Sequence, residues 1–161
     1  MMGHKKRGNK KAQSSLELLI TLAFGLSVLL PVVVLAFLQV AGATSTLATA
    51  ESQEAATKLA GIATAIGAQS YPAKQLVLIQ IPPNLNNILI GSTTAQGGVG
   101  HEIIFVVSTS AGLSYVTAYT PVNVSGYLQN ILQPGTYLVN VSAQNSCPSL
   151  NSVPCVYIKS T

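Results

Sequence analysis

Side chains able to carry out acid–base or metal chemistry are scarce in this sequence of 161 residues. Beyond the N-terminal segment His101 is the only histidine, so a metal-ligand set or a Ser-His-Asp triad would lack members. The chain has no aspartate, and Glu51 and Glu54 are expected to lie on a solvated helix face. We therefore expect no catalytic residue, no bound metal, no cofactor and no enzymatic activity.

Two other kinds of side chain indicate covalent modification. Cys147 and Cys155 are the only cysteines and lie close together near the end of the sequence, which favours a disulfide over two free thiols. Such a bond is expected to persist only in an oxidising, extracytoplasmic setting. Asn123 and Asn140 each begin an Asn-Val-Ser triplet, which is the N-glycosylation pattern but also arises by chance in a chain rich in Asn and Ser.

The positive charge is concentrated near the N-terminus. Five of the eight Lys and Arg residues lie in the first twelve positions, and beyond them three lysines face four glutamates. A nucleic-acid-binding domain carries its positive charge on the folded body, so we expect no nucleic-acid partner. Few charges and many Ser, Thr, Asn and Gln residues suit a surface that packs against copies of itself.

A long uncharged run follows the basic segment. No charged residue lies between Leu18 and Ala50, and residues 18–38 are almost wholly apolar. A bilayer core needs roughly 20 apolar residues in a helix, so we expect residues 16–40 to span a membrane. The positive-inside rule places the N-terminus in the cytoplasm and the later chain outside. A buried core helix is the alternative, but the remaining domain is small for covering such a helix on all sides.

We expect one long helix over residues 13–69. Beyond the apolar run it should bury a stripe formed by Leu47, Leu59, Ile62 and Ile66. Glu54 and Lys58 have the favourable order for a helical ion pair. The helical pattern is ended by a Tyr-Pro step that follows residue 69, because the residue before a proline avoids helical backbone angles. Pro31 is expected to kink or locally melt the helix, because it cannot donate a backbone hydrogen bond.

The remainder, residues 70–161, is predicted to be rich in β-strands. Six β-branched and aromatic runs are separated by turn signals: Gln75–Ile81, Asn87–Gly91, Glu102–Ser108, Leu113–Thr120, Thr136–Ala143 and Cys155–Ser160. Tyr137 follows a turn glycine at the start of a strand, as in the tyrosine corner of immunoglobulin-like domains. The predicted fold class is α+β, a long hydrophobic helix followed by an antiparallel, immunoglobulin-like β-sandwich.

The order of the N-terminal features is distinctive. "KKA" (Lys10–Ala12) is followed directly by Gln13, and the apolar run begins only afterwards, whereas a secretory signal has its small-residue site after the apolar core. This order resembles the class III signal peptide of type IV pilins. "AQSSLELL" is similar to the archaeal version, Gln-x-Ser-x-Glu followed by Leu, Tyr or Phe.

The resemblance implies a route from precursor to filament. A prepilin peptidase would recognise Lys10 and Lys11 and cut between Ala12 and Gln13, removing residues 1–12 as a leader. A membrane platform and an assembly ATPase would then assemble the subunits into a homo-oligomeric helical filament on the cell surface, with the apolar helices in its core. From the charges alone, we expect Glu17 to pair after assembly with the new α-amino group of Gln13, in its own chain or the next one. The alternative is a carboxylate at the cytoplasmic headgroup level, favourably placed near a helix N-terminus.

Other functions with the same leader stay open. A pseudopilin-like or membrane-anchored extracellular binding protein would not form long filaments. An archaellin usually has Gly before the cleavage site, and a membrane-anchored enzyme is disfavoured by the missing catalytic groups.

Overall fold

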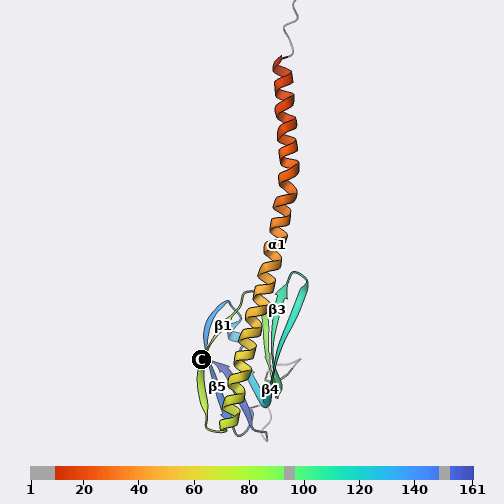
Figure 1. Cartoon of the computed structure of the whole chain (residues 1–161). Helices are drawn as coiled ribbons and strands as arrows, with labels where there is room; N and C mark the ends of the chain where they lie inside the picture. Colours follow the sequence, from red (N-terminus) through yellow and green to blue (C-terminus); the bar gives the residue numbers. More distant parts are fainter. Residues whose placement is uncertain (1–9, 93–96, 149–152) are drawn as a thin grey trace, which may run out of the picture. The chain divides into compact units, whose positions relative to one another are not determined.

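The computed structural model describes residues 10–92, 97–148 and 153–161, with side chains from residue 15 onward. Its elements are α1 (Lys10–Gln69), β1 (Lys74–Ile81), β2 (Leu85–Ile90), β3 (Gly100–Thr109), β4 (Gly112–Tyr127), the 3-10 helix η1 (Gln129–Ile131), β5 (Gly135–Gln144) and β6 (Cys155–Ser160). The fold class is α+β, with a long N-terminal helix followed by strands, as predicted (Figure 1). The chain divides into two compact units, residues 1–41 and 42–161, and the division falls within α1.

The second unit contains one six-stranded sheet with the strand order β1-β5-β6-β4-β3-β2. Neighbouring strands are antiparallel except β4 and β6, which pair in parallel from Val124 opposite Val156 to Tyr127 opposite Lys159. The expected antiparallel, immunoglobulin-like sandwich is therefore not confirmed, because the strands form a single mixed sheet.

The parallel pairing uses a part of β4 that the sequence pattern did not assign to a strand. The pattern predicted a strand ending at Thr120, but β4 continues to Tyr127, and this extension pairs with β6. Gly126 lies opposite Ile158, and a Cβ atom built on it would lie 2.2 Å from the Ile158 carbonyl oxygen. Glycine therefore permits the close approach of the two strands.

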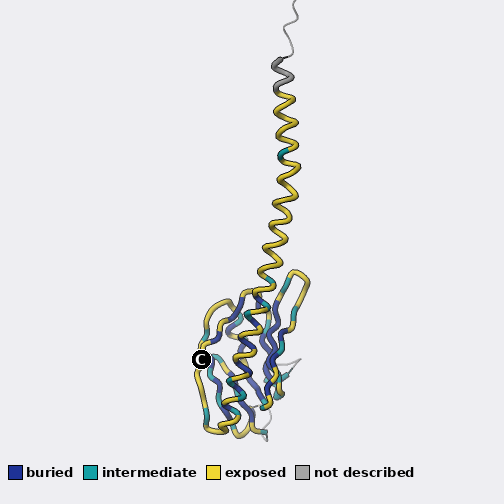
Figure 2. Tube along the Cα trace, viewed as in Figure 1, coloured by how far each residue is buried: buried dark blue, intermediate teal, exposed yellow. Residues whose placement is uncertain are grey.

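One face of the sheet packs against the part of α1 that belongs to the second unit. The buried helix residues recur three or four positions apart, as expected for one helix face: Ala48, Ser52, Ala55, Ala56, Leu59, Ala60, Ala63 and Ile66. The hydrophobic ones form a single core with alternate residues of all six strands, among them Ile79, Phe105 and Val139 (Figure 2). Most of the helix contribution is alanine, which keeps the helix backbone close to the sheet.

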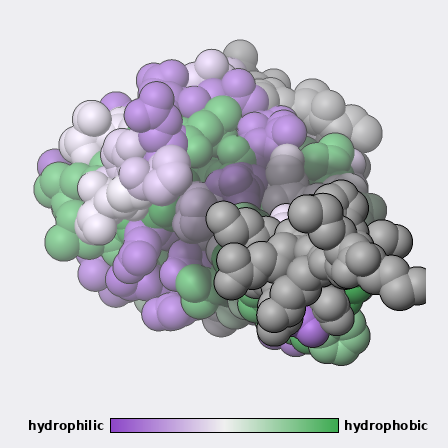
Figure 3. Space-filling model, turned by 90° about the horizontal axis from the view of Figure 1, so that it is seen from above, coloured by the Kyte–Doolittle hydropathy of each residue, from purple (hydrophilic) through white to green (hydrophobic). Residues whose placement is uncertain are grey.

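The predicted buried stripe is only partly right. Leu59 and Ile66 are buried and Ile62 packs against the core, but Leu47 is 57% exposed. The other face of the sheet carries a smaller buried cluster formed by Leu89, Ile104 and Val106. The surface drawn in Figure 3 mixes hydrophilic residues with separate hydrophobic patches.

Candidate functional site

The candidate assembly surface is the apolar segment of α1 in the first unit. Every large hydrophobic side chain from Leu16 to Val40 is exposed, with exposed fractions between 49% and 74%. Within the described residues α1 is the one helix long and apolar enough to cross a membrane, and none of its most apolar window is buried. The core helix of a soluble protein would be mostly buried, so this segment does not have the burial of a core helix.

Glu17 lies near the start of this segment and is exposed. It is the only charged residue between Ser15 and Ala50. Its backbone carbonyl accepts a hydrogen bond from Thr21 Oγ1 at 2.7 Å. Because the threonine hydroxyl donates to its own helix, it needs no outside acceptor, and the carboxylate is left as the group that needs a partner in an apolar environment.

Three other threonines of α1 make the same bond to the carbonyl four residues earlier. The pairs are Thr46 with Gly42, Thr49 with Ser45, and Thr64 with Ala60. These threonine hydroxyls are thus satisfied within the helix, which makes their positions compatible with a packed or membrane setting.

The sequence-predicted processing site lies at the beginning of α1. The helix begins at Lys10, so the peptide bond between Ala12 and Gln13 lies in its first turn. The side chains of Lys10, Lys11, Ala12 and Gln13 fall outside the described part of the structure, as do residues 1–9. Glu17 follows Gln13 by four residues, a rise of about 6 Å along a helix axis.

Pro31 lies inside α1, which continues from Lys10 to Gln69. The proline has no N–H group, so the carbonyl of Ser27 loses its usual partner four residues later. Of the two outcomes predicted for Pro31, local melting is not seen, because α1 is helical on both sides of Pro31 and at Pro31 itself. A kink at Pro31 stays a prediction.

The predicted disulfide is confirmed. Cys147 and Cys155 are bonded and buried, with a Cα–Cα distance of 5.6 Å. The backbone N–H of Cys147 also donates to the carbonyl of Val153 at 2.9 Å. The disulfide therefore fastens the chain after β5 to the first residue of β6.

The two candidate glycosylation sites have different surroundings. Asn123 lies in β4, with its Nδ2 atom 3.5 Å from the carbonyl oxygen of Pro154. Asn140 lies within β5 between strands β1 and β6, and its Oδ1 atom is buried without a hydrogen-bond partner. A glycan therefore has easier access to Asn123 than to Asn140, and modification of either residue remains a prediction.

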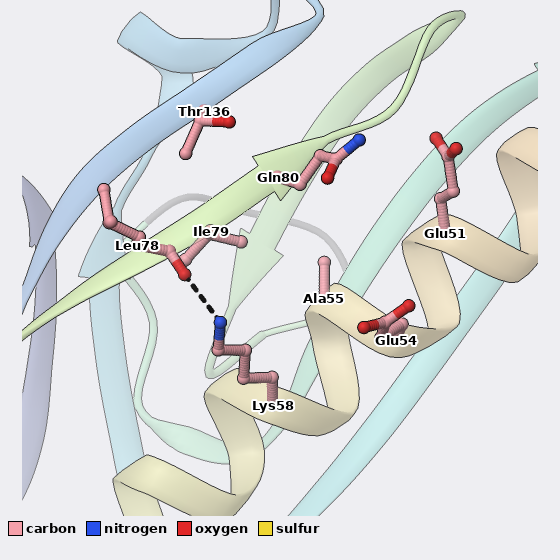
Figure 4. Close-up of a pocket in the computed structure, with 8 residues that line it drawn as sticks. All are labelled: Glu51, Glu54, Ala55, Lys58, Leu78, Ile79, Gln80 and Thr136. Atoms are coloured by element: carbon pink, nitrogen blue, oxygen red, sulfur yellow. Dashed lines mark hydrogen bonds between the residues drawn. The ribbon is translucent and has the colours of Figure 1, made fainter.

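A groove runs between α1 and the edge strand β1 (Figure 4). Its volume is about 290 Å³, and its lining includes Glu51, Glu54 and Lys58 on the helix and Leu78 and Gln80 on the strand. The sequence predicted an ion pair between Glu54 and Lys58. Instead, Figure 4 shows Lys58 directed towards β1, where its Nζ donates to the Leu78 carbonyl at 2.8 Å.

This bond gives Lys58 a structural role that sequence reasoning missed. Among the described strands β1 pairs with β5 alone, so its other edge offers backbone groups with which a further strand could pair. Lys58 covers one of those carbonyls. The helical spacing predicted Glu54 as the partner of Lys58. The partner in the structure is the Leu78 carbonyl, which could not be predicted without knowing that the edge strand β1 lies beside the helix.

A second hollow region surrounds Tyr71, just after the end of α1. Two adjoining hollows, of about 340 Å³ and 680 Å³, share Tyr71, Ala143, Gln144 and Asn145 in their lining. His101 lines the first hollow, and its Nδ1 lies 3.2 Å from the Thr120 carbonyl. No local sequence pattern predicts this region, because its residues come from separate elements.

Within the described residues there is no group of three His, Cys, Asp or Glu side chains that could hold a metal ion. The described residues that line the groove of Figure 4 include the carboxylates Glu51 and Glu54 and the lysine Lys58, with no histidine or cysteine. Comparison of the chain with protein-family models, with curated proteins and with solved structures finds no match.

Proposed function

We propose that this chain is the structural subunit of an archaeal type IV pilus-like adhesion filament, made as a membrane-inserted precursor. The proposal rests on the part of α1 that belongs to the first unit. This part exposes apolar side chains on every side, and it follows the "KKAQ" segment and contains Glu17 near its start. A helix that is apolar all round is stable only in lipid or inside a bundle of other helices.

The same surface serves both stages of the proposed route. Before assembly lipid covers residues 16–40, with the N-terminus in the cytoplasm and the strand-rich unit outside. A prepilin peptidase removes residues 1–12, recognising Lys10 and Lys11 and cutting after Ala12. The membrane platform and assembly ATPase then transfer the helix into a filament core, where helices of other copies replace the lipid.

Glu17 is the residue that links processing to assembly. Cleavage creates a positively charged α-amino group at Gln13, one helical turn from Glu17. In an apolar core an unpaired carboxylate is strongly disfavoured, so the two groups attract each other within one chain or between neighbouring chains. Pairing between chains would set the axial register of the subunits.

The disulfide supports the extracellular location of the second unit. Its cysteines lie after the apolar segment in the chain, on the side that the positive-inside rule places outside the cell. An oxidising environment is where such a bond persists.

The proposal is tested by expressing the full chain in an archaeal host that has the peptidase and the assembly machinery. Surface filaments are sheared off, imaged by electron microscopy and identified by mass spectrometry. We expect the chain, starting at Gln13, to be the dominant filament protein. A processed chain that stays in the membrane fraction without filaments would instead support a membrane-anchored extracellular binding protein.

Glu17→Ala tests the assembly residue directly. We expect this variant to be cleaved and inserted normally but to yield at least ten-fold fewer filaments. Glu54→Ala is the matched control, because Glu54 is an exposed carboxylate of the same helix outside the apolar segment. Filament yield of the Glu17→Ala variant equal to that of the control would refute the role of Glu17.

A further inference from the structure

We propose that the groove around Tyr71, defined by the two hollows that share this residue, binds a neutral oligosaccharide. Every residue that carries this proposal lies in the second unit, so the proposal does not rest on the role proposed for the apolar segment. The proposal rests on the shape of the groove, on the chemistry of its walls and on its charge.

The shape suits an elongated ligand. The two hollows have volumes of about 340 Å³ and 680 Å³, within the range of about 300–1,000 Å³ of small-molecule sites. Tyr71 belongs to both, so its side chain stands where they meet, and it is 61% exposed. An exposed tyrosine ring offers a flat apolar face with a hydroxyl at its tip. The C–H face of a sugar ring can stack on such a surface, with further sugar units extending into each hollow.

The walls offer the paired donors and acceptors that sugar hydroxyls require. Gln144 and Asn145 line both hollows, and Asn123 lines the first. Each amide group both donates and accepts, so it can bind two neighbouring hydroxyl groups, which themselves donate and accept. Asn123 is only weakly engaged within the protein, because its 3.5 Å contact with Pro154 lies at the limit of a hydrogen bond.

His101 also lines the first hollow. Its Nδ1 faces a backbone carbonyl, which can only accept, so in the neutral ring Nδ1 carries the proton. Nε2 is then the acceptor of the neutral ring.

The charge of the groove selects against ionic ligands. Among the described residues that line the two hollows there is no carboxylate, and the basic side chains are Lys74 in one hollow and His101 in the other. Phosphate-rich ligands such as nucleic acids are held by several Lys and Arg residues together. A groove with amides, hydroxyls, one exposed tyrosine and a single lysine matches an uncharged polyhydroxyl chain better than a polyanion.

Saturation-transfer difference NMR tests the proposal on the full chain. Because Asn123 heads a glycosylation triplet, the protein is produced in a host without N-glycosylation, and it is kept in a detergent that contains no sugar. The probes are maltotriose, mannotriose and triacetylchitotriose, with a trisaccharide that carries carboxylates as the charged comparison. We expect saturation transfer to at least one neutral probe, at millimolar concentration, and weaker transfer to the charged one.

Substitutions then locate the site. Tyr71→Ala should weaken binding of the neutral probe at least ten-fold, whereas Tyr71→Phe should retain most of it. Tyr119→Ala is the matched control, because Tyr119 is also exposed, at 74%, but lies outside both hollows. Asn145→Ala, at an exposed position, should weaken binding several-fold and gives a second variant if Tyr71→Ala does not fold.

Three results would overturn the proposal. They are the absence of transfer to every neutral probe, stronger transfer to the charged probe, and equal binding by the Tyr71→Ala and Tyr119→Ala variants. None of them bears on filament formation, and a loss of filaments in the Glu17→Ala variant does not bear on sugar binding.

Discussion

Two glycines of α1 provide a sharp test of how the helix packs on the sheet. Gly61 and Gly67 lie on the same helix, six residues apart. A Cβ atom built on Gly61 meets nothing within 4 Å, whereas one built on Gly67 lies 2.7 Å from Cγ1 and 3.0 Å from Cβ of Val122. The same substitution, glycine to alanine, should therefore have opposite effects at the two positions.

The expected magnitudes follow from these contacts. At Gly61 alanine improves helix propensity without a clash, so Gly61→Ala should raise the free energy of unfolding by about 0.5–1 kcal/mol. At Gly67 the new methyl group meets the branched side chain of Val122, which has little rotamer freedom. Overpacking of this kind costs about 1–3 kcal/mol. Because Gly67 lies near the helix end, the propensity gain is smaller there, and we expect a net loss of about 1–2 kcal/mol.

Thermal unfolding of the full chain in detergent, followed by circular dichroism, measures both effects. The second unit has 120 residues, so a change of 1 kcal/mol should move its Tm by roughly 3–6 °C. Adding Val122→Ala to Gly67→Ala removes the clashing methyl groups. In a double-mutant cycle the two changes should therefore couple favourably by about 1 kcal/mol or more.

Two results would contradict this packing. One is a shift of Tm in the same direction and by similar amounts for the two glycine substitutions. The other is simple additivity of the effects of Gly67→Ala and Val122→Ala. Either result would mean that α1 does not approach β4 as closely as the structure shows.

Two further predictions concern the same unit. The disulfide closes a loop with a sequence separation of 8 residues, so replacing Cys147 and Cys155 by serine should lower the free energy of unfolding by about 2–3 kcal/mol. Reductant should then lower the Tm of the wild type but not that of the double-serine variant. Lys58→Met should cost only about 0.5–1 kcal/mol, because Lys58 is exposed, but it uncovers the edge of β1. Light scattering should show more self-association for Lys58→Met than for Lys74→Met, an exposed lysine without this bond to Leu78, and equal scattering would contradict the edge-covering role.

The sequence predicted the strands well but not their partners. Alternation of apolar residues locates a strand such as β5, since the period of two is a local property of the backbone. The parallel pairing of β4 with β6 depends on a strand extension that contains Pro121, Asn123 and Gly126, residues that read locally as a turn. Burial of apolar side chains in the core stabilises this extended conformation more than the local turn preferences oppose it. No local sequence pattern could therefore predict the mixed topology.

The candidate sites were predictable to different degrees. The disulfide followed from two cysteines with few alternatives, and the exposed apolar segment followed from length and composition. Lys58 and the Tyr71 groove were not predictable, because each depends on residues far apart in sequence that the fold brings together. Burial of Ala48, Ala56 and Ala63 in place of the exposed Leu47 likewise depends on how closely the helix lies on the sheet.

Glu17 separates the two functions that the apolar helix could serve. A membrane anchor needs only the apolar side chains, and a carboxylate at their edge slightly opposes insertion. A filament subunit needs a contact that forms after processing and fixes one helix against the next, and a charge that acquires its partner only when the chain is cut provides one. Glu17→Gln keeps the size of a long side chain and removes the charge. If Glu17 serves assembly, this change should leave membrane insertion intact or improved while filament yield falls, whereas a plain anchor would be unaffected or improved in every assay.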